Sequence, residues 1–462
     1  MLVHLPTTVV SLSTLDFVLI FIYFIVLLII GYLTHRKQKA DDYLIAQRKL
    51  GTWSTMATIN ASKSGSILMI FVAITYLWGF SAVWYFIGVI TGVAIFIPFA
   101  LKLKQASKQK FYTLADYFKN KYGKTSAGFA SAISIFLMFG MAVLNIIAGT
   151  KIFVFFTGWP FWVCALIMVF VISAYLYLGG FKAVAKTDII QYAAMIIIFI
   201  ILVLVMFKGS LIPATEWNFL RADLFTIIGF FIIGIMFPFA SPELWQRVYS
   251  SKGKKQLRNG LWLSLGFYTI MALMLALVAL TIKAQFPGID PDLALVQGFK
   301  NLLPPGLIGL ATVLLFAAIM SSLDTYIYTG ASALIQDFFN WAKQKIVNNI
   351  KKVIFIFAII GTLIAISIQN LIIGSYLFAS FYTVLSLPVI ATWIKSKIRA
   401  RTIIISFITG ILGVAIFLVI SLSMGEITPT IVLVAIASSI LGLLIGGIVS
   451  FIKKTQVKAS SN

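Results

Sequence analysis

The sequence is poor in charge and in reactive side chains. Only 11% of its 462 residues are Asp, Glu, Lys or Arg, and it contains one cysteine and two histidines. Cys164 lies in an apolar run and has no partner for an intramolecular disulfide, so we expect it to be a packing residue. His4 and His35 lie near one terminus and in a charged loop, which argues against a histidine-based metal or catalytic site. Long hydrophilic stretches are also scarce, which leaves no room for a globular enzyme domain, and we expect no enzymatic activity.

Acidic residues are scarcer than basic ones. The chain has 13 Asp and Glu against 36 Lys and Arg, a net charge of +23. In a soluble protein this excess would indicate nucleic acid, but 61% of the residues are hydrophobic and apolar runs of 18 residues or more recur. This composition predicts an all-α polytopic membrane protein, in which positive charge marks the cytoplasmic side. The expected partners are therefore the lipid bilayer and not nucleic acid, and no obligate protein partner is evident.

Thirteen apolar stretches are long enough to cross a bilayer as helices. They cover about 14–34, 51–78, 80–101, 126–155, 159–178, 187–208, 222–248, 259–282, 305–335, 352–371, 373–394, 402–424 and 428–451. All but six of the Lys and Arg residues fall in alternate loops, which sets the cytoplasmic side. The N-terminus is then outside and the C-terminus inside an inner or plasma membrane. Residues 1–13 contain no Lys or Arg, so no cleaved signal peptide is expected.

Two of these spans are interrupted. Residues 57–66 read Ala-Thr-Ile-Asn-Ala-Ser-Lys-Ser-Gly-Ser in mid-span, and residues 237–243 contain two prolines. Paired interruptions at matching positions of two inverted halves indicate a secondary transporter with its site at the membrane midplane. The halves would be 51–208 and 222–394, between an extra N-terminal helix at 14–34 and peripheral helices at 402–451, in one transporter domain over residues 1–462. The alternative is that Pro and Gly are common in membrane helices.

A run of hydroxyl and carboxylate residues lies in the span at 305–335. On a helix, residues three and four apart share a face, which groups the Ala318 carbonyl with the Ser321 and Ser322 hydroxyls. Such oxygens suit sodium, and carbonyls freed at the break near Thr58 and Ala61 would complete a five-oxygen cage. The alternative is that these serines bond back to carbonyls of their own helix.

Three long motifs occur in order: GGFKAVAKTDIIQ, PELWQRVYSSKG and AAIMSSLDTYIYTGASALIQDFF. Together they resemble the sodium:solute symporter family of sodium-coupled glucose, proline, pantothenate, monocarboxylate and sialic acid carriers. The resemblance covers about residues 14–394 and implies a LeuT-like core of five plus five inverted helices. It also implies two ion sites. The first is a sodium site at Thr58, Ala61, Ala318, Ser321 and Ser322. The second, which holds a cation or a proton, maps onto Ser321, Asp324, Thr325 and Asp188.

Lys63 departs from the family pattern, in which this part of the first core helix carries small or uncharged residues. A buried ammonium is costly, and three interpretations compete. Lys63 pairs with the carboxylate of an anionic substrate, or it forms an internal ion pair with an acid such as Asp324, or its charge replaces the coupling ion. The expected substrate contacts are Asn60, Lys63, Ser64 and Gly65 at the first break and Phe237 at the second, with helix packing as the alternative for Asn60, Ser64, Gly65 and Phe237.

The sequence therefore predicts sodium-coupled symport of a small organic solute by alternating access. The Lys63 ammonium favours a carboxylate-bearing solute, such as an amino acid or organic acid. One alternative is a proton-coupled or sodium-independent carrier of the same fold. Another, from a different class, is a membrane sensor that binds the solute without transporting it. The coupling ion is expected to be Na+, with H+ as the alternative.

Overall fold

The protein is a bundle of helices. The computed structural model describes residues 14–35, 39–107, 110–207, 212–304, 307–339, 341–394, 398–424 and 427–459. In these ranges the only strand-like pairing is one isolated bridge between Leu50 and Ser251. The helices are α1 (Thr14–His35), α2 (Ala40–Ile45), α3 (Thr52–Ala61), α4 (Ile67–Trp78), α5 (Trp84–Ala106), α6 (Leu114–Tyr122), α7 (Lys124–Thr157), α8 (Phe161–Phe207), α9 (Leu224–Met236), α10 (Pro242–Ser250), α11 (Lys254–Gln285), α12 (Ala294–Leu302), α13 (Leu307–Phe338), α14 (Lys343–Ile368), α15 (Leu371–Ile394), α16 (Ala400–Met424) and α17 (Ile431–Ala459).

The number of membrane-crossing helices differs from the expected thirteen. Within the described residues, ten helical stretches are long and apolar enough to cross a bilayer, or eleven when the bent pair α9–α10 is counted as one span. The count is lower because helical structure continues through two expected boundaries, at 78–80 and at 178–187, and because the expected span at 222–248 is the bent pair. The expected thirteen spans are thus not confirmed. Residues 208 and 305, at which other boundaries are expected, lie outside the described residues, as do residues 1–13, in which no signal peptide is expected.

Gly180 interrupts α8 at one of these boundaries. Its backbone has φ +53° and ψ −150°, so helical geometry stops there although helical residues continue on both sides. A Cβ at this position would lie 2.5 Å from the ring of Tyr43, which packs against the chain. Glycine is therefore required at position 180 for two reasons. Residues with a side chain rarely adopt this φ, and the Tyr43 ring leaves no space for a Cβ atom. The turn expected between the spans at 159–178 and 187–208 corresponds to this kink.

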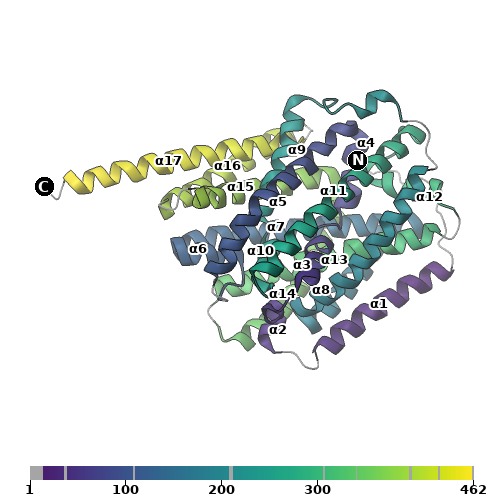
Figure 1. Cartoon of the computed structure of the whole chain (residues 1–462), viewed down its shortest axis with the longest axis horizontal. Coiled ribbons are helices and arrows are strands. Elements are labelled where there is room, and N and C mark those ends of the chain that lie inside the picture. The colour runs from purple at the N-terminus through teal and green to yellow at the C-terminus, as the bar shows by residue number, and fades with distance from the viewer. Residues whose placement is uncertain are drawn as a thin grey trace.

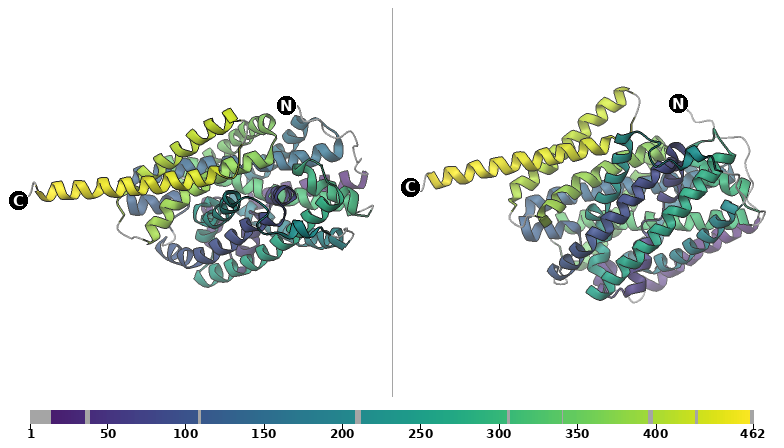
Figure 2. Two further views of the ribbon diagram at one scale, coloured as in Figure 1. Left: turned by 90° about the horizontal axis from the view of Figure 1, so that it is seen from above. Right: turned by 45° about the horizontal axis from the view of Figure 1, so that its top comes forward.

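The helices at the two edges of the bundle show large apolar side chains on their outer faces. Figure 1 places α1 at one edge and α16 with α17 at the opposite edge, and α17 extends beyond the rest of the bundle in both views of Figure 2. Phe21 on α1 and Val419 on α16 are 64% and 69% exposed. An exposed apolar belt of this kind faces lipid in a membrane protein. The assignment of residues 14–34 and 402–451 as helices that flank the two repeats stays a prediction.

The centre of the bundle is α13. It packs against α7 and α8, and its residues from Leu315 to Ala333 are buried without interruption. Several of these residues are polar, including Ser321 and Asp324, which are both fully buried. Since buried polar groups need hydrogen-bond partners, the helices around α13 must supply them. Among the chain segments that do so are α8, which bonds to Ser321 and Asp324, and the two broken helices, which bond to Ser322 and Thr325.

Candidate functional site

The first broken helix is α3–α4. Regular helix ends at Ala61 and resumes at Ile67, with turns and bends between them. The Ser64 hydroxyl donates to the Asn60 carbonyl at 2.7 Å, which is a local bond that competes with helix formation. Two backbone N–H groups freed by the break find side-chain acceptors on other helices: the Gly65 N–H donates to Ser322 Oγ and the Ser66 N–H to Asn145 Oδ1, both at 2.9 Å. The break expected at 57–66 is therefore present and hydrogen-bonded.

Gly65 lies closely packed between α7 and α13. A Cβ added here would lie 2.4 Å from Asn145 Oδ1 and 2.4 Å from Ser322 Cβ. The backbone therefore approaches both helices more closely than any residue with a side chain would allow. The position is fixed by packing against these two helices.

The second broken helix is α9–α10. After Met236 the chain makes a short 3-10 turn over Phe237–Ala240, and α10 begins at Pro242, with a bend of 41° between the two parts. Pro238 and Pro242 lack the N–H that a continuous helix would use, which is the physical reason for the bend. The Ser241 hydroxyl bonds to the Phe237 carbonyl at 2.7 Å and stabilises the turn. The interruption expected at 237–243 is present.

Lys63 and Glu243 join the two breaks. The ammonium of Lys63 forms an ion pair with Glu243 and donates to Ser241 Oγ at 3.0 Å. It also lies 3.8 Å from the centre of the Phe237 ring, a cation–π contact. Lys63 is 7% exposed and Glu243 is fully buried. Of the three interpretations of Lys63, the internal ion pair is the one seen, and its acid is Glu243 rather than Asp324.

The expected sodium oxygens lie where α3 meets α13. The Ser322 hydroxyl donates to the Ala61 carbonyl at 3.2 Å, and the Ser321 hydroxyl donates to Asp188 Oδ1 at 2.7 Å. Both serines thus bond to other helices and not back to their own. Thr58 and Ala318 are fully buried on α3 and α13, which pack together. The Thr58 carbonyl accepts the Ser62 N–H at 3.1 Å.

The expected second cation site also contains Arg247, which the family resemblance does not imply. Arg247 Nη2 lies 3.1 Å from Asp188 Oδ2 and 2.8 Å from Thr325 Oγ1, so the guanidinium bridges these two residues. Asp324 Oδ2 accepts hydrogen bonds from the Tyr175 hydroxyl and, at 3.4 Å, from Thr187 Oγ1. Its Oδ1 has no hydrogen-bond partner among the described residues. In the sequence, Arg247 is one of the many basic residues that mark the cytoplasmic side of a membrane protein. Its position four residues after Glu243, on a helix that begins with proline, is the one local signal of a buried role.

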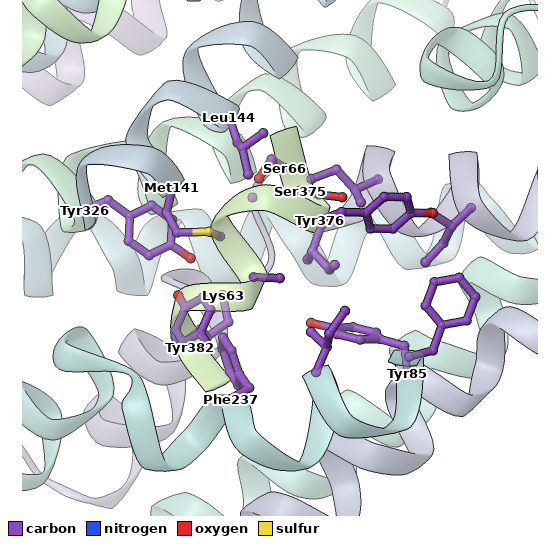
Figure 3. A pocket seen from close by; sticks show the side chains of 17 residues that line it. Lys63, Ser66, Tyr85, Met141, Leu144, Phe237, Tyr326, Ser375, Tyr376 and Tyr382 are labelled. Carbon is purple, nitrogen blue, oxygen red and sulfur yellow. The ribbon is translucent and has the colours of Figure 1, made fainter. Parts of the chain in front are cut away.

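A cavity adjoins the two breaks. It measures about 750 Å³, counting the part that is open to solvent, and residues of α4, α5, α7, α9, α13 and α15 line it. Figure 3 shows Lys63, Phe237 and Tyr382 grouped on one side of the cavity, with Tyr376 and Tyr85 further along. Of the expected substrate contacts, Lys63, Gly65 and Phe237 line it. Asn60 and Ser64 are buried in α3 and in the break, and they do not line the cavity.

The sequence matches a known protein family over most of its length. The sodium:solute symporter family matches residues 43–378, which include both breaks and the expected ion-site residues. This chain belongs to the sodium:solute symporter family.

Several other transporters resemble the chain along most of its length. A sodium/proline symporter of Staphylococcus aureus (strain Newman) is 25% identical over 348 residues, which are 70% of this chain and 68% of the relative. The structure of a substrate-bound, outward-open Na+-coupled sialic acid symporter superposes with a TM-score of 0.79 at 18% identity, over 94% of this chain and 98% of the other. A closed nucleobase-cation-symport-1 family transporter superposes with a TM-score of 0.61 at 13% identity, over 89% and 95%. These likenesses support the expected LeuT-like fold.

The symporter family and the apolar helices together show a multi-pass protein of the cell membrane.

Sequence reasoning missed the tyrosines that line the cavity, Tyr85, Tyr326, Tyr376 and Tyr382. A tyrosine in an apolar span is equally typical of helix packing, so no local signal marked them. They converge only because three different helices, α5, α13 and α15, surround one space, and α15 contributes two of the tyrosines.

Proposed function

We propose that this symporter-family protein couples the entry of sodium to the uptake of a small organic solute by alternating access. The observation that carries the proposal is the attachment of the first break to α13. Ser322 accepts from the Gly65 N–H and donates to the Ala61 carbonyl, so one hydroxyl holds both sides of the break. Broken helices at membrane depth are tolerated where they line a cavity or an ion site, and this break adjoins a cavity. The names of the relatives add support, because both the proline and the sialic acid carriers are sodium-coupled.

The proposed sodium ligands are the carbonyls of Thr58, Ala61 and Ala318 and the hydroxyls of Ser321 and Ser322. Sodium at this position would bind α3 and α13 at once. It would therefore favour the conformation in which the break and α13 are in contact. The solute cavity lies beside the same break, so each ligand raises the affinity of the other. The work of uptake then comes from the sodium gradient.

The second ion position is proposed at Asp324, with Asp188 and Thr325 held by Arg247. Two buried carboxylates and one guanidinium leave one negative charge uncompensated. Like charges buried in one cluster repel unless a cation or a proton is present. A second sodium or a proton at Asp324 would balance the cluster. The alternative in which Lys63 replaces the coupling ion is disfavoured, because Glu243 already neutralises it.

The topology remains part of the proposal. The described helices agree with thirteen spans if α8 is divided at Gly180, if the stretch 67–106 is divided near Gly79 and if the bent pair is counted. The inverted repeats at 51–208 and 222–394, the outside N-terminus and the inside C-terminus follow from that count and from the distribution of basic residues.

The test is uptake into proteoliposomes. A panel of sugars, amino acids and organic acids is screened with an inward sodium gradient, and the accumulated solute is then measured with potassium replacing sodium. The membrane potential and pH gradient are held fixed. Accumulation that survives the replacement would refute sodium coupling and favour the proton-coupled carrier. Solute binding without any flux would favour the sensor.

A further inference from the structure

The cavity has a simple electrostatic property. Lys63 is the one charged side chain among the described residues that line it. Its ammonium is in contact with Glu243, which is fully buried and does not reach the cavity surface. The positive charge of Lys63 is therefore already neutralised by Glu243, on the side of Lys63 away from the cavity. The cavity floor has no net charge.

The rest of the lining is apolar and aromatic, with a few hydroxyl groups. Ile67, Ile70 and Leu144 contribute aliphatic surface. The hydroxyls of Tyr376 and Tyr382 form no hydrogen bond of regular geometry among the described residues, although Trp78 and Ser241 lie near enough to interact with them. Buried hydroxyls without regular hydrogen bonds are rare, and they are a ready source of hydrogen bonds for a ligand. Figure 3 shows the rings of both tyrosines beside the cavity.

We infer that the solute has no net charge and a largely apolar body, and that Glu243 sets this preference by neutralising Lys63. An anion would have to take Lys63 from Glu243, which would leave a buried carboxylate without a partner, and that is strongly unfavourable. A cation would meet the ammonium of Lys63 on a face that offers no free acid. Uncharged and zwitterionic molecules escape both penalties. The inference rests on the proposal that this cavity holds the solute.

This preference differs from the one expected from the sequence. A lysine in mid-membrane by itself favours a carboxylate-bearing solute. With Glu243 as its partner, Lys63 is not available to a simple carboxylate, and the tyrosine hydroxyls become the polar contacts. Selectivity by charge then depends on a residue that the solute does not touch.

The test is direct binding to the purified full-length protein in sodium-containing buffer, measured by calorimetry. Four probes share one ring and differ in charge: benzamide is uncharged, phenylalanine is zwitterionic, benzoate is an anion and benzylamine is a cation. We expect benzamide or phenylalanine to bind at least about tenfold more tightly than benzoate and benzylamine. Which of the two net-neutral probes binds distinguishes an uncharged from a zwitterionic solute class.

Two variants test the role of Glu243. In Glu243→Gln, Lys63 loses its carboxylate partner, and we expect the affinity for benzoate to rise at least about tenfold relative to benzamide. In the double variant Lys63→Met with Glu243→Gln both charges are gone, and the preference for a net-neutral probe should return. The double variant also shows whether a failure of the single variant is a failure to fold.

The proposal is overturned if the unmodified protein prefers benzoate or benzylamine, if neither net-neutral probe binds, or if Glu243→Gln leaves the ratio of affinities unchanged. These results are separate from the test of transport. Binding of a net-neutral probe without sodium-driven flux would refute the transport proposal but not this inference. Sodium-driven flux of an anion would refute this inference but not the transport proposal.

Discussion

Replacing Ser322 with alanine removes the hydroxyl that connects α13 to the break between α3 and α4. That hydroxyl accepts from the Gly65 N–H at 2.9 Å and donates to the Ala61 carbonyl at 3.2 Å, in a fully packed interior. A buried N–H left without an acceptor costs about 1–3 kcal/mol, and the lost bond to the carbonyl about 1 kcal/mol more. We therefore expect the free energy of unfolding to fall by about 2–4 kcal/mol.

The same substitution removes one of the five oxygens of the proposed sodium site. We expect the sodium concentration that gives half of the maximal rise in melting temperature to increase about tenfold. This increase corresponds to a loss of about 1.4 kcal/mol of sodium-binding free energy. The assay is the melting temperature of the purified protein as a function of sodium, at constant ionic strength with potassium. A ligand that binds only the folded state raises the melting temperature once its concentration exceeds the dissociation constant. The rise should begin at about tenfold higher sodium in Ser322→Ala.

Ser264→Ala is the matched control. Ser264 is equally buried, on α11, and donates at 2.8 Å to the Gly260 carbonyl of its own helix. Its loss should leave the sodium midpoint where it is and change the free energy of unfolding by no more than about 1 kcal/mol. If Ser322→Ala showed the same sodium midpoint as Ser264→Ala and the unmodified protein, Ser322 would not be a sodium ligand, and the reasoning about the break would fail.

Three further substitutions test other parts of the structure. Arg247→Met leaves Asp188 buried without its partner, and we expect the free energy of unfolding to fall by about 3–5 kcal/mol, with a smaller loss in Arg247→Lys, as measured by thermal unfolding in micelles. Gly180→Ala forces a side chain into the left-handed region, and a loss of at least about 1 kcal/mol should lower the melting temperature; no loss would mean that the kink is not required. Asp41 is half-exposed, and its hydrogen bond from Lys343 lowers the pKa of Asp41 below its ordinary value. The contribution of this pair is therefore present above about pH 4 and lost as the pH falls further, and Asp41→Asn should change the free energy of unfolding near neutral pH by less than about 1 kcal/mol.

The positions of the two breaks could be predicted because they depend on local chemistry. Polar residues and glycine in mid-span at 57–66, and two prolines at 237–243, cannot continue a regular helix wherever the helix is placed. The approach of the first break to Ser322 could also be anticipated, because the motif around it resembles a known family. The exact division of the apolar stretches into spans could not, because a kink such as that at Gly180 keeps helical residues on both sides.

The amino-acid sequence by itself determined that this protein is a helical membrane protein of the sodium:solute symporter family with two interrupted helices. Long apolar runs, uneven basic charge and helix-breaking residues act locally and need no knowledge of packing. Only the tertiary structure decided that Lys63 pairs with Glu243, that Arg247 lies between Asp188 and Thr325, and that four tyrosines share one cavity. A buried charge takes whichever opposite charge the packing brings within reach, and two residues 180 positions apart meet only when both broken helices fold against α13.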